Sequence, residues 1–292
     1  MSKPVTFLHL TDLHIANPAK QEPHHFTDTA ATLTAVLDKA RAIQPKPSFV
    51  IVSGDIANNA DPAAYEELKR LWGDFDVPVL FGLGNHDSRE GFYSVMLGRA
   101  DDAAAPYFHH AVIAGVHVVV LDSSTPGKVH GTIEPEQFEW LERTLDAHPD
   151  VPTLIVSHHP PAIGEEADEF AFETIDFDDS QRLAAILAPH NIVGILSGHI
   201  HQDRVSLWHG IPVVVTNGHH SSMDVLNTDG LRALRGAGFA LGLLRPSGLT
   251  ISYVPLASDR VELFRVSRER LLGLTADMSA GRAEELAMAA AE

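Results

Sequence analysis

Residues 5–14, VTFLHLTDLH, decide the fold of this chain. The run 5–10 is short and apolar, as in buried strands. Directly after it come Asp12 and His14, a carboxylate and an imidazole two residues apart. Side chains at alternate positions of an extended segment point the same way. The segment therefore predicts a buried strand that delivers two ligands to one metal centre.

Four later segments show the same pattern: residue types that bind metals follow the end of an apolar run. They are Gly54-Asp55, Gly84-Asn85-His86-Asp87, His158-His159 and Gly198-His199-Ile200-His201. Ligands bind at the carboxyl ends of strands in open α/β sheets, so these side chains are expected to converge. Oxygen and imidazole ligands without sulfur favour Mn, Fe, Co or Zn over an all-oxygen Mg or Ca site. One histidine alone would carry little weight; the ordered set predicts a metal site.

Amphipathic stretches separate the apolar runs. The pattern predicts strands at 5–10, 49–52, 79–81, 116–121, 153–156 and 192–196, and helices at 29–43, 62–72, 134–145 and 180–187. The pair Asp61-Pro62 is typical of a helix start, with an N-cap followed by proline at the first helical position. Alternation of strands and helices predicts an α/β fold in which helices cover the sheets.

The pattern changes after His201. Strands are predicted at 204–208, 211–215, 239–244 and 249–254, with little helix between them. This indicates that the C-terminal third completes a second, more antiparallel sheet. We predict a single domain over 1–274. The Ala- and Glu-rich tail, 275–292, is expected to be helical or frayed and carries no recognisable chemistry.

The composition disfavours several classes of partner and of site. A formal net charge of −18, from 39 acidic and 21 basic side chains, disfavours long nucleic acids and anionic membranes as partners. The chain has no cysteine, which excludes disulfides and thiolate ligands. No segment has the pattern of a secretion signal or the length of a membrane span, so the default expectation is a soluble cytoplasmic protein.

Together the motifs resemble the calcineurin-like metallophosphoesterase superfamily, whose pattern is D-x-H, G-D, G-N-H-D/E, H and G-H-x-H. Further segments are similar to the bacterial class III cyclic-nucleotide phosphodiesterases and related glycerophosphodiesterases: Leu121-Asp122-Ser123, Gly127, His130-Gly131, Gln137, Trp140-Leu141 and His158-His159-Pro160-Pro161. The resemblance spans roughly residues 5 to 255. It implies a four-layer αββα sandwich of two mixed sheets.

The resemblance also implies a site with two metal ions. One would be held by Asp12, His14, Asp55 and His201, and the other by Asp55, Asn85, His158 and His199, with Asp55 bridging. Mn or Fe is expected, with Zn or Co as alternatives. A hydroxide bridging the metals would attack the phosphorus. His86 would be the catalytic histidine, and Asp87 would orient it.

The expected activity is hydrolysis of small phosphodiesters, such as cyclic nucleotides or glycerophosphodiesters. The protein Ser/Thr phosphatases of the superfamily carry Arg-Gly after the Gly-Asp motif, whereas here 56–60 reads IANNA. A phosphomonoesterase is the main alternative, because the shared metal core serves both reactions. An inactive interaction scaffold is disfavoured, because no ligand is missing and His86 is present. The resemblance also implies a homodimer.

Several residues keep more than one interpretation. Asn85 and His86 are expected to contact substrate, and His219 and His220 are candidates for the same role. The loop residues His24 and His25, and the segment 165–173, would either line the substrate cleft or lie in solvent. We expect His158 to face the metals while His159 turns away, and His9 to pack within its strand.

Overall fold

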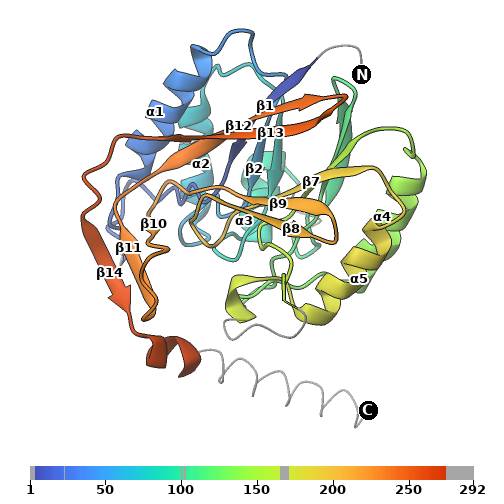
Figure 1. Cartoon of the computed structure of the whole chain (residues 1–292). Helices are drawn as coiled ribbons and strands as arrows, with labels where there is room; N and C mark the ends of the chain where they lie inside the picture. Colours follow the sequence, from blue (N-terminus) through green and yellow to red (C-terminus); the bar gives the residue numbers. More distant parts are fainter. Residues whose placement is uncertain (1–3, 23, 100, 102, 165–170, 274–292) are drawn as a thin grey trace.

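The structure is a computed structural model that describes residues 4–22, 24–99, 101, 103–164 and 171–273. Most of these residues lie in or beside two large mixed sheets (Figure 1). The predicted tail 275–292 lies outside the described residues. Within the described residues, no helix is both long enough and apolar enough to span a bilayer.

The first large sheet has five strands and the second has six. In spatial order, the first is β13 (Gly248–Pro255), β12 (Gly238–Arg245), β1 (Val5–Leu10), β2 (Phe49–Ser53) and β3 (Val79–Gly82). The second is β4 (His109–Ile113), β5 (Val116–Val120), β6 (Thr153–Val156), β7 (Ile192–Ser197), β9 (Ile211–Val215) and β8 (Arg204–Trp208).

The two sheets pack face to face through a buried apolar layer. Phe7 and Phe49 stack with ring centroids 5.2 Å apart on the inner face of the five-stranded sheet. They share one buried cluster with Val118 and Val156 of the six-stranded sheet. Because both faces of the central strands are buried, β2, β5 and β6 read as continuous apolar runs rather than alternating ones.

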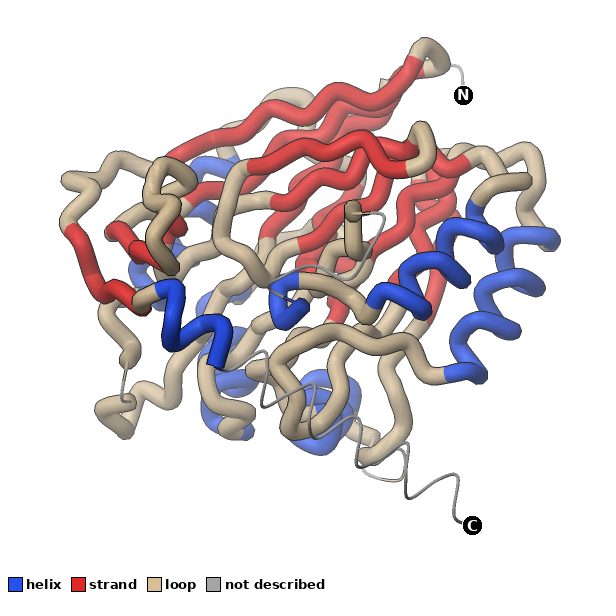
Figure 2. The backbone as a smooth tube through the Cα atoms, turned by 60° about the horizontal axis from the view of Figure 1, so that its bottom comes forward, coloured by secondary structure: helices blue, strands red, loops and turns tan. Residues whose placement is uncertain are grey.

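Helices cover both outer faces (Figure 2). On the five-stranded sheet lie α1 (Thr29–Arg41), α2 (Pro62–Trp72) and α3 (Arg89–Leu97), and on the six-stranded sheet lie α4 (Pro135–Asp146) and α5 (Phe177–Leu187). The predicted four-layer αββα sandwich is therefore confirmed. The predicted start of α2 is also confirmed, since the Asp61 side chain accepts a hydrogen bond from Ala63 N.

The prediction for the C-terminal third was wrong in one respect. Strands β8 and β9 do complete the second, six-stranded sheet, but β12 and β13 extend the first, five-stranded one instead. A third, three-stranded sheet forms from β10 (Ser222–Met223), β11 (Leu231–Leu234) and β14 (Glu262–Val266). Helix α3 and strand β4 were also missed. Both are short, and α3 contains Gly91, a poor helix former.

The topology brings the motif loops to one edge of the molecule. Strands β1, β2 and β3 run parallel, as do β5, β6, β7 and β9. The carboxyl ends of parallel strands share an edge, and the predicted ligands follow β1, β2, β3, β6 and β7 directly. The fold thus explains why distant segments of the sequence meet.

We predict that Gly242→Ala destabilises the sandwich. Gly242 pairs directly with Phe7, and an added Cβ would lie 2.1 Å from Phe7 Cζ. Forcing a methyl group into a packed core costs about 1–3 kcal/mol. Urea unfolding should therefore show a lower midpoint. Gly273→Ala is the control, because its Cβ meets no described atom within 4 Å. Equal midpoints for the two variants would contradict this account of the core.

Candidate metal centre

The predicted ligands converge in two neighbouring groups. In the first, His201 Nε2 lies 3.2 Å from His14 Nε2 and 3.2 Å from Asp12 Oδ1. In the second, His158 Nε2 lies 3.3 Å from Asp55 Oδ2 and 3.2 Å from Asn85 Oδ1. Two ligands on one tetrahedral ion at metal–ligand distances of about 2.0–2.1 Å are separated by about 3.3 Å. These spacings therefore suit ligands that share an ion.

Asp55 lies between the two groups. Its Oδ2 is 3.3 Å from His158 Nε2 and 3.7 Å from His14 Nε2. Its Oδ1 accepts a hydrogen bond of 2.8 Å from His86 N, which fixes the orientation of the carboxylate. His199 stands beside the second group, with its ring centroid 5.2 Å from that of His158. One carboxylate thus faces both halves of the centre.

Backbone carbonyls set the tautomers of the histidines. A carbonyl can only accept, so each ring nitrogen that contacts one carries the proton, and the other nitrogen keeps its lone pair. His158 Nδ1 donates to Ser53 O at 3.0 Å, and His199 Nε2 donates to Phe172 O at 2.8 Å. His201 Nδ1 contacts Ser221 O at 3.2 Å. Metal-binding histidines are usually oriented in this way.

The ligands lie on strained backbone. The following positions all have positive φ: Asp12, His14, Asp55, His199 and His201, with values of 50°, 44°, 48°, 71° and 49°. Residues with a Cβ rarely adopt this left-handed region, at a cost of about 1–2 kcal/mol each. Such strain clusters at functional sites, where the surrounding structure holds it in place. The positive φ values therefore distinguish these loops from ordinary turns and mark them as part of a functional site.

Two glycines permit the ligands to come this close. A Cβ on Gly84 would lie 2.2 Å from Asp55 Oδ1, and a Cβ on Gly198 would lie 2.4 Å from Asp12 Oδ2. Any side chain at either position would displace a carboxylate. The glycines of the sequence motifs are thus required by contact with the ligands themselves.

Buried negative charge makes the site suited to cations. Asp12 and Asp55 are 0% and 2% exposed, and their ion-pair partners among the described residues are histidines rather than Lys or Arg. Burial would raise the pKa of each carboxyl, but neighbouring imidazoles lower it below its ordinary value. Burial likewise opposes the charged form of His158, yet Asp55 and Asp12 raise its pKa to about 9. Bound metal ions would replace that proton as the counter-charge.

The predicted contact between His86 and Asp87 is not formed. The His86 side chain is exposed at the mouth of the site, and its Nδ1 contacts Asn58 O at 2.7 Å. Asp87 does not contact that ring. Its carboxylate instead accepts hydrogen bonds from Tyr65 Oη and from backbone N–H groups, among them those of Ala57 and Gly84. The predicted orientation of His86 by Asp87 is therefore corrected: Asn58 orients the ring, while Asp87 is saturated by donors that fix the loop.

A cavity of about 370 Å³ opens over the ligands. Its polar lining includes Asn58, Asn59, Asn85 and His86. Apolar side chains from distant segments also line it: Val129, Phe172, Met223, Leu231 and Phe264. A cavity of this size, with convergent polar groups and an apolar wall, is typical of a small-molecule site.

Only some of the histidines and loop residues proposed for substrate contact line the cavity. His220 and His24 line the cavity, whereas His219 is fully buried and does not. His25 stacks on His220, with ring centroids 5.5 Å apart. Of the segment 165–173, residues 172 and 173 line the cavity, and 165–170 lie outside the described residues. The histidine pair 219–220 thus contributes one cavity residue rather than two.

Protein groups contact both ring nitrogens of His159 and of His9. His159 Nδ1 contacts Ser123 Oγ at 2.9 Å, and its Nε2 contacts Val129 O at 2.9 Å. His9 lies within β1, with Nε2 and Nδ1 each 2.8 Å from a hydroxyl oxygen, of Ser53 and Thr216 respectively. His9 packs within its strand as predicted, whereas a His159 nitrogen lies within 4.8 Å of candidate ligand atoms of His158 and His199 although both of its nitrogens contact protein groups.

Some cavity residues were missed from the sequence. Asn58 and Asn59 follow the Gly-Asp motif within a few positions, so their place after a strand could have indicated them. Phe264 carries no such signal. It lies in β14, far along the chain, and the third sheet alone brings it to the site.

A family model described as calcineurin-like phosphoesterase matches residues 5–203, and the chain belongs to this family. A probable cyclic nucleotide phosphodiesterase of Rhodococcus erythropolis is 31% identical over 88% of this chain and 85% of its own. A cAMP/cGMP dual specificity phosphodiesterase of Mycobacterium tuberculosis is 29% identical over 85% of this chain and 79% of its own.

A purple acid phosphatase from yellow lupin has a similar fold, with a TM-score of 0.56 at 14% identity, over 93% of this chain and 55% of that one. The family and the related phosphodiesterases identify the protein as a phosphoric ester hydrolase of the metallophosphoesterase class.

We predict that His9 contributes to the loss of stability in acid. Burial lowers its pKa to about 3, whereas an unfolded histidine titrates near 6.5. Below pH 6.5 the unfolded state therefore binds a proton that the folded state excludes. Stability should fall with decreasing pH by up to about 1.4 kcal/mol per pH unit from this group.

Urea unfolding between pH 7 and 5 measures this effect, with a chelator present so that proton-coupled metal release does not add to the slope. His9→Gln should flatten the pH dependence. Thr216→Val, which removes one partner of the ring but keeps the imidazole, should retain it. Identical slopes for His9→Gln and the unmodified protein would contradict the prediction.

Proposed function

We propose that this protein hydrolyses small phosphodiesters at a two-metal centre built from Asp12, His14, Asp55, Asn85, His158, His199 and His201. The observation that carries the proposal is the convergence of these ligands in two groups beside Asp55 Oδ2, with a ring nitrogen of His158, His199 and His201 left for coordination by a contact on the opposite side of the ring. Such a centre, when filled, supplies Lewis acidity toward the phosphate and activates water.

The donor set fits this assignment. Carboxylate, amide and imidazole ligands suit Mn or Fe, with Zn or Co as alternatives. The first ion would be held by Asp12, His14, Asp55 and His201. The second would be held by Asp55, Asn85, His158 and His199. The two carboxylates need compensating cations, so the centre also explains how a chain of net charge −18 binds an anionic ester.

His86 is positioned to serve the leaving group. With its Nδ1–H donating to Asn58 O at 2.7 Å, its Nε2 is the nitrogen left to exchange a proton. The ring lines the cavity, and its centroid lies 4.8 Å from that of His14. Protonated at Nε2, it would donate to the departing alkoxide as general acid, an effect worth about 10²–10⁴-fold.

The apolar wall favours a substrate that carries a planar base. Phe172 and Phe264 offer aromatic surface within a cavity of about 370 Å³. A cyclic nucleotide would place its phosphate at the ligands and its base against this wall. A glycerophosphodiester has no ring to place against Phe172 or Phe264. We therefore place cyclic nucleotides first among the small diesters.

Diester and monoester activity should be compared directly. Protein reloaded with Mn²⁺ should cleave a nitrophenyl diester faster than the matching monoester. Asn85→Ala removes an oxygen 3.2 Å from His158 Nε2 and should abolish nearly all turnover. His86→Gln should keep bound metal but lower kcat by about 10²–10⁴-fold.

The outcomes separate the alternatives. Cleavage of the monoester alone would replace the diesterase with a phosphomonoesterase. No cleavage of either ester by metal-loaded protein would favour an inactive scaffold. Metal content measured on each variant shows whether a loss of rate comes from loss of the centre or of His86.

We predict that Phe264→Ala weakens binding of cyclic nucleotides. Stacking of a base on an aromatic ring contributes about 1–3 kcal/mol, so KM for cyclic AMP should rise about tenfold. KM for glycerophosphoethanolamine, which has no ring, should stay unchanged. Leu226→Ala is the control, since Leu226 is apolar and exposed but does not line the cavity. Equal changes for both substrates would show that Phe264 supports the cavity rather than the base.

A further inference from the structure

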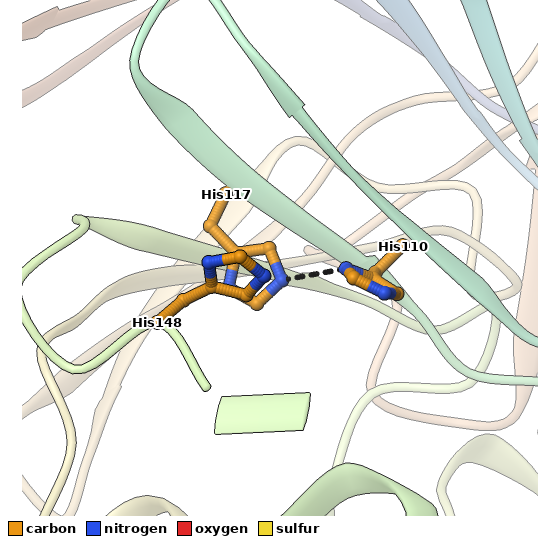
Figure 3. Close-up of side chains that lie close together, drawn as sticks. All are labelled: His110, His117 and His148. Carbon is orange, nitrogen blue, oxygen red and sulfur yellow. Dashed lines mark hydrogen bonds between the residues drawn. The ribbon is translucent and has the colours of Figure 1, made fainter. Parts of the chain in front are cut away.

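A second histidine cluster lies away from the catalytic loops. Its members are His110 of β4, His117 of β5 and His148, which follows α4 (Figure 3). Their candidate ligand atoms all lie within 4.8 Å of one another. His117 is fully buried, His148 is half-buried and His110 is exposed, so the cluster reaches from the protein interior to solvent.

Two members of the cluster, His117 and His148, stand at the opposite end of the sheet from the metal centre, and His110 reaches them from its position opposite Val119. His117 stands near the amino end of β5, whereas the catalytic ligands follow the carboxyl ends of the parallel strands. His148 lies where the chain leaves α4 to enter β6, again at the amino edge. The three rings therefore cannot take part in the phosphoesterase site.

The ring geometry resembles that of shared ligands. His110 Nδ1 lies 3.1 Å from His117 Nε2, as drawn in Figure 3. This is close to the 3.2 Å between His14 Nε2 and His201 Nε2 in the catalytic centre. It is also near the separation of about 3.3 Å expected for two nitrogens on one tetrahedral ion.

A hydroxyl orients the buried member of the cluster. Thr153 Oγ1 donates its hydrogen to Val151 O at 3.1 Å, so it accepts from His117 Nδ1 at 3.3 Å. The proton is thus on Nδ1, and the lone pair of His117 Nε2 points at His110. A hydrogen-bonded second nitrogen of this kind is typical of metal-binding histidines.

The electrostatics also suit neutral imidazoles. Among the described residues, no carboxylate lies within ion-pair distance of the three rings. Burial, and then His148 and His110, lower the pKa of His117 to about 4. The one hydrogen bond printed between these rings joins His110 Nδ1 to His117 Nε2, and a cation placed between them would take its place by accepting both nitrogens as ligands.

We propose that His110, His117 and His148 form a structural site for a divalent ion that prefers imidazole, Zn²⁺ first among them. Three imidazoles and a water molecule complete a tetrahedral shell, and nitrogen-only ligands suit Zn²⁺, Cu²⁺ and Ni²⁺. The ring of His148, in the loop after α4, closes onto the ion. The bound ion ties the β4–β5 hairpin, at the edge of the six-stranded sheet, to the connection between α4 and β6.

Metal content tests the site in the full-length holoenzyme. Wild type and the double variant His110→Gln/His148→Gln are loaded with Zn²⁺, desalted and compared by elemental analysis. Zinc bound at the catalytic centre is the same in both proteins, so wild type should retain one more equivalent of zinc per chain than the double variant. His190→Gln is the matched control, because His190 lies at the same edge of the sheet, after α5, but outside the cluster. It should retain the wild-type content.

Equal zinc in wild type and the double variant would overturn the proposal. Turnover of a phosphodiester should be the same in both proteins; a parallel loss of turnover would place the missing ion in the catalytic centre and also overturn it. Zn²⁺ should raise the Tm of wild type by roughly 2–4 °C more than that of the double variant. The single variants His110→Gln and His148→Gln provide the same comparison with less disturbance to folding.

Trp140 provides a second, local measurement. Its ring centroid lies 5.9 Å from that of His110, so Cu²⁺ bound at the cluster should quench its fluorescence. The quenching should disappear in His110→Gln/His148→Gln and be reduced in Trp140→Phe. Undiminished quenching in the double histidine variant would show that the copper is bound elsewhere and would overturn the site.

Discussion

The buried carboxylates Asp12 and Asp55 are the constraint on which the rest of the structure depends. Each ends a central parallel strand of the five-stranded sheet, and each is nearly excluded from solvent. Burial and mutual repulsion both oppose their charged forms. Neighbouring imidazoles offset part of that cost, and the cations proposed above would offset more of it. His14 follows β1 of the same sheet, but the other histidines of the site follow β6 and β7 of the six-stranded sheet, so the candidate centre forms only where the two sheets meet.

Holding these groups together requires strain, and the sandwich supplies the rigidity that maintains it. Ligands with positive φ stand in the loops after β1, β2 and β7, each directly beyond a buried strand. The apolar layer between the sheets fixes the strand ends, so the loops cannot relax without disturbing that layer. Gly84 and Gly198 remove the Cβ atoms that would otherwise separate the carboxylates from their neighbours. The packing of the core thus stabilises the strained backbone on which the ligand geometry depends.

The sequence predicts the ligands better than the substrate site. The ligands follow recognisable strands directly, whereas the cavity residues are placed by loops and by non-local strand pairing. Asp12, Asp55 and His158 each follow an apolar run, and the topology of parallel strands carries them to one edge whatever the details of the loops. The orientation of His86 depends on a backbone carbonyl, that of Asn58, which no side-chain pattern reveals. Phe264 reaches the cavity only through the small third sheet, whose strands are short and whose pairing is non-local.

The same reasoning explains why two clusters of imidazoles can serve different ends in one fold. At the carboxyl edge, histidines meet carboxylates, and mixed ligands with bound water suit hydrolysis. At the amino edge, His117 and its neighbours meet no carboxylate among the described residues, so an ion there would find only imidazole ligands from the protein. The position of a histidine cluster on the sheet therefore decides its role. At the carboxyl edge it takes part in catalysis, and at the amino edge it ties the β4–β5 hairpin to the rest of the protein.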